Sequence, residues 1–203
     1  MMPELFKTIV VDPPWLERGG GRITRGAQRH YELMDKSAII RTITQCEHWN
    51  NIGVDAHLYL WVTNNHLPDG LEVMSALGFK YVTNVCWTKD RHGLGQYFRG
   101  QHEICLFGTR GKGYNVRTSD KSISTVVNAR RTQHSRKPDA FYDMVERKAA
   151  GRISISSAEE TDLDGLSGVM KLRRLLRKLI IQRLPMKLML SIIMIFMEHQ
   201  FKV

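Results

Sequence analysis

The chain has 203 residues, of which 42% are hydrophobic and 25% are charged, a composition typical of a soluble globular protein that argues against general disorder. This length fits one α/β domain better than two. Lysine and arginine outnumber aspartate and glutamate by 30 to 20, with a sequence pI of about 9.7. That excess suits a polyanionic partner such as nucleic acid, although an ordinary solvated surface has the same composition.

The spacing of the cysteines and histidines argues against disulfide-rich proteins and against metal-binding proteins. Cys46, Cys86 and Cys105 are widely spaced and form no CxxC pair, so neither a disulfide framework nor a zinc site is indicated. The histidines show no ligand spacing either, and no metal is expected. Because the N-terminus has no apolar signal region and no run reaches about 18 apolar residues, we expect a cytoplasmic protein without a membrane partner.

The first predicted element is a strand that ends at a rigid corner. Residues 8–11 are a short β-branched run that stops at Asp12-Pro13-Pro14, because proline removes a ladder donor and fixes φ. In open α/β sheets the carboxyl end of a strand is where ligands bind. Residues 16–30 are rich in Gly and Arg without periodicity, which indicates a loop.

The following elements alternate between helices and strands. Asp35 is a candidate N-cap for a helix that runs to Cys46, and Gly78 is a candidate C-cap for a later one. The complete set is a helix at 36–46, a strand at 57–62, a helix at 71–77, strands at 81–87, 103–108 and 125–127, and a helix from Pro138 to Arg147. This order predicts an α/β fold with a doubly wound, Rossmann-like, largely parallel sheet.

The corner Asp12-Pro13-Pro14-Trp15 carries the candidate chemistry. An adenine amine is a poor nucleophile because its lone pair is delocalised, so an enzyme must accept hydrogen bonds from it while holding an electrophilic methyl in line. The Asp12 carboxylate and the Pro13 carbonyl are two such acceptors, and the prolines hold them stiffly. A base in a duplex must be flipped out to reach them, and Trp15 and Tyr31 are candidates to stack on it. The competing interpretation is a rigid turn with a half-buried tryptophan.

Several sequence blocks together span residues 8–147. The blocks are Ile9-Val10-Val11-Asp12-Pro13-Pro14-Trp15, His30-Tyr31-Glu32-Leu33-Met34, His57-Leu58-Tyr59-Leu60-Trp61-Val62-Thr63-Asn64, Trp87-Thr88-Lys89, His102-Glu103-Ile104-Cys105-Leu106-Phe107-Gly108, and His134-Ser135-Arg136-Lys137-Pro138-Asp139 running into Phe141 to Arg147. In content and order they resemble one enzyme family, the adenine-N6 methyltransferases named after the seventy-kilodalton subunit of the messenger-RNA enzyme (MT-A type), in particular bacterial and phage members.

The resemblance implies specific roles. The cofactor would be S-adenosylmethionine, with Asp12 and Pro13 binding the target amine beside the donor methyl and with Pro14 and Trp15 shaping the pocket. Lys137 would contact the cofactor together with Asp12, and a cation at this point suits the cofactor's carboxylate. His30 and Tyr31 would clamp the flipped nucleotide.

Trp61 and Trp87, which end strands on alternating patterns, are better explained as core residues than as substrate contacts. Without the resemblance, Lys137 would be an ordinary exposed lysine and Tyr31 a packing residue.

The composition changes after Arg147. Residues 148–203 contain no Trp or Tyr and carry a basic Leu/Ile run followed by an apolar stretch, whereas the family continues with a strand and a closing Gly-Asn-Glu or Gly-Asn-Gln. Shifted by one reading frame, the codons of residues 152–171 permit YFDLFSRRNRPGWTVWGNE, with the family's elements in register. We therefore expect a methyltransferase domain at 1–147 lacking its last native strand, and an out-of-frame tail at 148–203. A basic amphipathic helix is the alternative interpretation of the tail.

Two functions follow as expectations. The first is a DNA adenine methyltransferase, DNA being inferred from the compact, bacterial-like form; an RNA adenine methyltransferase differs only in substrate. The second is a catalytically inactive nucleic-acid-binding or partner subunit, because the family includes members that pair with an active sibling. A homodimer or a pairing with such a sibling subunit is expected in either case.

Overall fold

The computed structural model describes residues 5–16, 33–46, 49–93, 97–132 and 136–149, and the backbone of two strands at 152–157 and 191–195. The expectations for His30 and Tyr31 lie outside the described residues. Those for Asp12 to Trp15 and for Lys137 lie within them.

A seven-stranded mixed sheet forms the centre of the molecule, in the order β5-β3-β4-β2-β1-β6-β7. The strands are β1 (Phe6–Asp12), β2 (Ile52–Val62), β3 (Lys80–Thr88), β4 (His102–Arg110), β5 (Val126–Asn128), β6 (Arg152–Ser157) and β7 (Ser191–Ile195). β1 is parallel to both β2 and β6, and β3 is parallel to β5. β4 is antiparallel to its two neighbours, and β7 is antiparallel to β6.

The α/β class is confirmed, and the sheet is mixed because of how β3 and β4 are joined. The expectation was a largely parallel sheet, which requires a crossover between successive strands. The described residues between β3 and β4 contain no helix, and the two strands form an antiparallel hairpin that inserts β4 between β2 and β3. The carboxyl ends of β1, β2, β3, β5 and β6 still meet at one edge of the sheet, where β4 begins.

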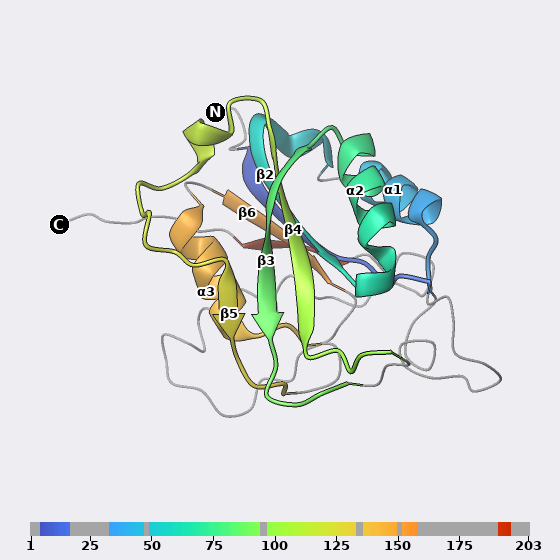
Figure 1. Ribbon diagram of the computed structural model, residues 1–203. Helices are drawn as coiled ribbons and strands as arrows, with labels where there is room; N and C mark the ends of the chain where they lie inside the picture. The colour runs from blue at the N-terminus through green and yellow to red at the C-terminus, as the bar shows by residue number, and fades with distance from the viewer. Residues whose placement is uncertain are drawn as a thin grey trace.

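Helices cover both faces of this sheet (Figure 1). The helices α1 (Lys36–Gln45) and α2 (Leu67–Ala76) lie on one face, and α3 (Asp139–Lys148) lies on the other. As predicted, the Asp35 carboxylate caps α1, accepting a hydrogen bond of 2.7 Å from the Ala38 N–H. Pro138 directly precedes α3, and Gly78 follows α2 with φ of 78°, a conformation that glycine adopts without a steric penalty.

Alternation along the strands divides the core into two clusters. In β1, Ile9 and Val11 face the layer with α1 and α2, whereas Val10 faces the layer with α3. Trp61 and Trp87 belong to the α3 layer and are each 2% exposed, so their prediction as core residues is confirmed. The two-residue period of each strand therefore delivers apolar side chains to both faces.

The segment after Arg147 contributes two strands to the sheet. β6 runs parallel to β1 from Phe6↔Arg152 to Asp12↔Ser157, and β7 lies outside it. β1 is therefore paired on both sides, with β2 and with β6.

Candidate active site

The corner after β1 is held by backbone hydrogen bonds. The Trp15 N–H donates to the Pro13 carbonyl at 3.0 Å, the Met34 N–H donates to the Pro14 carbonyl at 2.8 Å, and the Leu16 N–H donates to the Met34 carbonyl at 2.9 Å. Residues 13–16 are thus bound to the segment that leads into α1. Because two prolines already restrict φ, these bonds fix the position of the Asp12 carboxylate and the Pro13 carbonyl.

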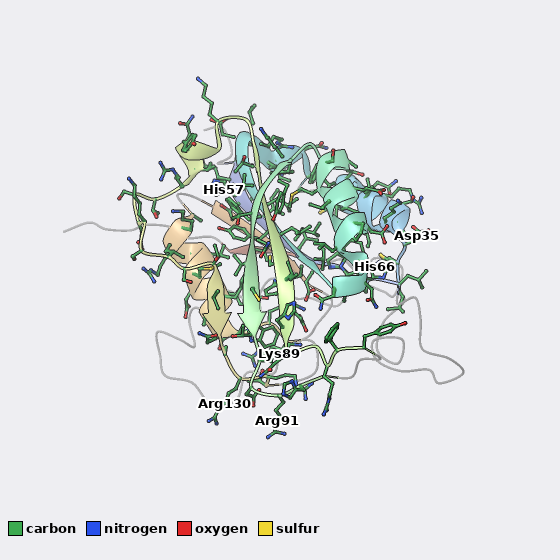
Figure 2. All side chains as sticks on the ribbon, in the orientation of Figure 1. Asp35, His57, His66, Lys89, Arg91 and Arg130 are labelled. Carbon is green, nitrogen blue, oxygen red and sulfur yellow. The ribbon has the colours of Figure 1, made fainter. Side chains whose placement is uncertain are left out.

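Trp15 supports this corner from inside the fold. Its side chain is 5% exposed, its indole Nε1–H donates to the Trp61 carbonyl at 2.9 Å, and its ring stacks on His66 with centroids 5.3 Å apart. His66, labelled in Figure 2 at the start of α2, bonds the Leu16 carbonyl at 2.7 Å and the Asp69 carboxylate at 2.8 Å. In this arrangement Trp15 supports the corner from inside, and because its side chain is buried, stacking on a base would require the corner to open.

Lys137 lies directly against Asp12, although 125 residues separate them in the chain. The Lys137 ammonium donates to Asp12 Oδ2 at 2.7 Å and lies 3.4 Å from Glu103 Oε2. It also stands 5.2 Å from the centre of the Trp61 ring, a cation–π contact. The Lys137 side chain is 8% exposed and that of Asp12 is 18% exposed, so the lysine is covered and the carboxylate is partly exposed.

Glu103, the second residue of β4, extends the ion pair into a row of alternating charges. Its carboxylate contacts Lys137 on one side and accepts a hydrogen bond from Lys89 on the other. Lys89, which follows β3, lies 4.8 Å from the centre of the Trp87 ring. These four side chains therefore form a row along the carboxyl edge of the sheet, in the order Asp12, Lys137, Glu103, Lys89, and the row contains two anions and two cations.

Burial and pairing act in opposite directions on these groups. Burial raises the pKa of Asp12 above its ordinary value, and Lys137 offsets part of that rise. Burial alone would raise the pKa of Glu103, but Lys137 and Lys89 together hold it below its ordinary value. Burial alone would lower the pKa of Lys137, but Asp12 and Glu103 raise it. At neutral pH the lysine is therefore charged.

The structure brings most of the predicted site together. Asp12, Pro13, Pro14 and Trp15 form one corner, and Lys137 reaches it from the start of α3. Glu103, Lys89 and His66 are contributors to which the sequence alone assigned no role. Glu103 and Lys89 each lie in a block that resembles the family, which is the one signal in the sequence that marks them, and nothing in the spacing marks His66.

Neither a metal site nor a membrane span is found in the part of the chain that the structure describes. These residues contain no group of three or more His, Cys, Asp or Glu side chains placed to hold a metal ion. No helix among them has both the length and the apolar content needed to cross a membrane.

Comparisons with known proteins agree on one family. The MT-A70 family model matches residues 6–156, about three quarters of the chain, and thus extends past Arg147 through most of β6. The chain is 30% identical over 163 residues to the N(6)-adenosine-methyltransferase subunit METTL3 of Danio rerio, with 74% of this chain and 24% of that protein covered. It is 28% identical over 163 residues to the N(6)-adenosine-methyltransferase catalytic subunit METTL3 of Homo sapiens, with coverage of 74% and 25%.

A third relative is the N(6)-adenosine-methyltransferase MT-A70-like protein of Arabidopsis thaliana, 28% identical over 153 residues, with 70% of this chain and 20% of that protein covered. The chain thus spans about a quarter or less of the length of these three relatives. The matched segment includes the corner at Asp12, the Glu103 strand and Lys137. The chain belongs to the MT-A70 family.

Proposed function

We propose that this chain is an S-adenosylmethionine-dependent methyltransferase that acts on the exocyclic amine of adenine in a nucleic acid. The observation that carries the proposal is the partly exposed Asp12 carboxylate at the rigid end of β1, paired with a covered Lys137 at 2.7 Å. Relatives that match 74% of this chain are named N(6)-adenosine-methyltransferases.

Asp12 and Pro13 would bind the target amine. A carboxylate and a carbonyl accept hydrogen bonds, and an amine with two N–H groups donates two. The Pro13 carbonyl already accepts one bond from Trp15 N–H, but a carbonyl oxygen has a second lone pair. Because Lys137 favours the charged form of Asp12, the carboxylate stabilises the positive charge that develops on the amine nitrogen as it bonds the methyl carbon. The methylated nitrogen then loses one proton to solvent.

The residues at the corner fit the proposed cofactor. S-adenosylmethionine, when bound, supplies a methyl group on a positively charged sulfur, and transfer breaks the methyl–sulfur bond as the nitrogen–methyl bond forms. The amino-acid end of the cofactor carries an ammonium and a carboxylate, and the corner presents Asp12 and Lys137 side by side. The chemistry of this donor set therefore suits the cofactor, with Lys137 as the partner of its carboxylate.

DNA is the substrate that we propose, and RNA is the alternative to be tested beside it. The amine and its ring are the same in both polymers, so the corner at Asp12 does not distinguish them. The relatives' names contain adenosine, which makes an RNA oligonucleotide of matched sequence the required second substrate. The test measures N6-methyladenine by mass spectrometry after incubation with single-stranded DNA, duplex DNA and RNA.

Asp12→Asn tests the catalytic assignment, because it removes the charge but keeps the shape. Turnover should fall by about 100-fold or more, the usual effect of removing a group that stabilises transition-state charge. Asp143→Asn, an exposed carboxylate on α3, is the matched control and should leave turnover unchanged. Retention of turnover within about tenfold in Asp12→Asn would contradict the assignment, since the group would then contribute less than about 1.4 kcal/mol.

The reading frame of residues 148–203 is part of the same proposal. We propose that the shifted frame encodes the family's last strand and its closing Gly-Asn-Glu, which would complete the cofactor pocket. The frame-restored protein should bind S-adenosylmethionine more tightly by calorimetry and methylate adenine faster than the chain as given. Methyl transfer by neither form would reject the enzyme. Cofactor or nucleic-acid binding without transfer in both forms would favour the inactive subunit.

A further inference from the structure

The described residues 89–93 and 97–101 extend the hairpin of β3 and β4 beyond the sheet. The Lys89 N–H donates to the Gln101 carbonyl at 2.8 Å, and the Gln101 side chain donates back to the Lys89 carbonyl at 2.9 Å. Further out, the Gly93 N–H donates to the Gly100 carbonyl at 2.6 Å. The two chain segments therefore continue side by side beyond the sheet, at the edge where Asp12 lies.

Two aromatic side chains stand on this extension and are almost fully open to solvent. Tyr97 is 93% exposed and Phe98 is 90% exposed. Large apolar side chains exposed to this degree lose the free energy that burial would provide, and adjacent pairs of them mark interaction sites. An aromatic face also stacks on any nucleobase, whatever its sequence.

Arginines lie on the same hairpin extension and on the segment bound beside it. The segment 129–132 is bound to the hairpin, since the Arg131 N–H donates to Asp90 Oδ1 at 3.1 Å and the Ala129 N–H donates to the Thr88 carbonyl at 3.2 Å. Figure 2 shows Lys89, Arg91 and Arg130 close together below the ends of β3 and β4. Among the described residues at 89–93, 97–101 and 129–132 there are five cationic side chains and one anionic, a net charge of +4.

We propose that this surface binds the single-stranded nucleotides that flank the target adenine. We call this surface the basic aromatic edge, and it consists of Arg91, Arg99, Arg130, Arg131, Tyr97 and Phe98. Tyr97 and Phe98 stack on bases, and the arginines bind phosphates, a combination that suits a single strand rather than a closed duplex. The row Lys89, Glu103, Lys137, Asp12 leads from this edge to the corner, so a strand that places its adenine at Asp12 has neighbouring nucleotides on the edge.

This inference rests on the proposed function for its substrate, but its test reads binding separately from methyl transfer. The probe is a fluorescein-labelled single-stranded oligonucleotide of about 12 nucleotides, a length within the range of single-strand site sizes. Its binding to the full chain, and that of its duplex form for comparison, is measured by fluorescence anisotropy. Tyr97→Ala with Phe98→Ala should weaken single-strand binding by about tenfold or more, because stacking on each aromatic ring contributes about 1–3 kcal/mol. Arg130→Ala with Arg131→Ala should make the slope of log affinity against log salt shallower by about 0.7 for each phosphate that an arginine no longer neutralises.

Matched controls separate the edge from general charge and hydrophobicity. Tyr114, 80% exposed on the 3₁₀ helix η4 (Gly113–Val116), gives the aromatic control Tyr114→Ala. Lys112→Ala with Lys121→Ala removes two exposed cations outside the edge. Both controls should retain the affinity and salt dependence of the unmodified chain. All the substituted side chains are exposed, so circular dichroism melting curves should coincide.

The outcomes distinguish the two proposals. Unchanged single-strand affinity in the Tyr97/Phe98 variant, while the parent binds tightly, overturns the edge and leaves the proposed function standing. A change in sedimentation of this variant without a change in oligonucleotide affinity assigns the aromatic pair to a protein interface and also overturns it. Absence of oligonucleotide binding by the parent overturns the proposed function itself.

Discussion

Replacement of Lys137 by methionine should destabilise the fold far more than an ordinary lysine substitution does. Lys137→Met keeps the length of the side chain but removes the ammonium that lies 2.7 Å from Asp12 and 3.4 Å from Glu103. Both carboxylates are less than a third exposed, so solvent replaces the missing partner poorly. Breaking a buried ion pair by removing one member costs about 3–5 kcal/mol, and Lys89 remains to compensate Glu103. We expect a decrease of about 3 kcal/mol in the free energy of unfolding at about pH 8, where both carboxylates are charged.

The pH dependence provides a sharper check. In the unmodified chain the lowered pKa of Glu103 contributes stability that is present above its ordinary value of 4.5 and lost as the pH falls through the folded value. The raised pKa of Asp12 acts in the opposite sense, because the folded state holds that proton more tightly. Lys137→Met removes a cation that lowers the pKa of both groups. Its cost should therefore be largest near about pH 8 and should shrink as the pH falls toward about 4 and the carboxylates become neutral.

Urea unfolding monitored by tryptophan fluorescence at about pH 8 and about pH 4 measures both quantities. Arg136→Met is the matched control, because Arg136 pairs with Asp139 at 3.3 Å and the Asp139 side chain is 53% exposed. Such pairs contribute about 0–1 kcal/mol. Equal destabilisation in the two variants at the higher pH, or a Lys137→Met effect that does not diminish at the lower pH, would refute the argument that Lys137 compensates buried carboxylates.

Two further predictions concern packing. Gly108→Ala should lower the unfolding free energy by about 1–3 kcal/mol, because a Cβ there would lie 2.6 Å from Met74 Sδ. The control Gly100→Ala should change it little, because a Cβ there meets nothing within 4 Å. Equal urea midpoints for the two variants would contradict this. His66→Ala removes the ring stacked on Trp15 and should lower the free energy of unfolding by about 1–3 kcal/mol. Tryptophan emission should shift to the red as the corner loosens. An unchanged emission spectrum and urea midpoint would show that the stack is dispensable.

The ends of the helices were predicted well wherever a specific residue caps or terminates the helix. Asp35, Gly78 and Pro138 lie where helices begin or end, because a cap, a left-handed φ and a missing N–H are all local properties. The start of β2 was predicted five residues late. Ile52-Gly53-Val54-Asp55 contains residues that are depleted in strands, and pairing with Phe6 overrides that preference.

The site was predictable only in part, because its contacts join distant parts of the chain. The resemblance pointed to Asp12 and Lys137 separately, but their contact spans 125 residues and depends on how α3 packs against the sheet. The block around Glu103 resembles the family but does not show what its side chain contacts, and its role follows from β4 lying antiparallel beside β2 and β3. The direction of β4 was itself unpredicted, since alternation of strands and helices does not show which connections are hairpins.

The position of β1 between β2 and β6 has a consequence for the order of folding. The β3–β4 hairpin joins residues close in sequence and forms at little cost in loop entropy, and β2 then pairs with β4. β1 precedes the other described strands in the chain, yet one of its two neighbours begins at Arg152. The contact between Asp12 and Lys137 closes the same long loop. We therefore expect the β2–β4–β3 unit to form the early nucleus and the corner at Asp12 to assemble last, after most of the chain has been synthesised.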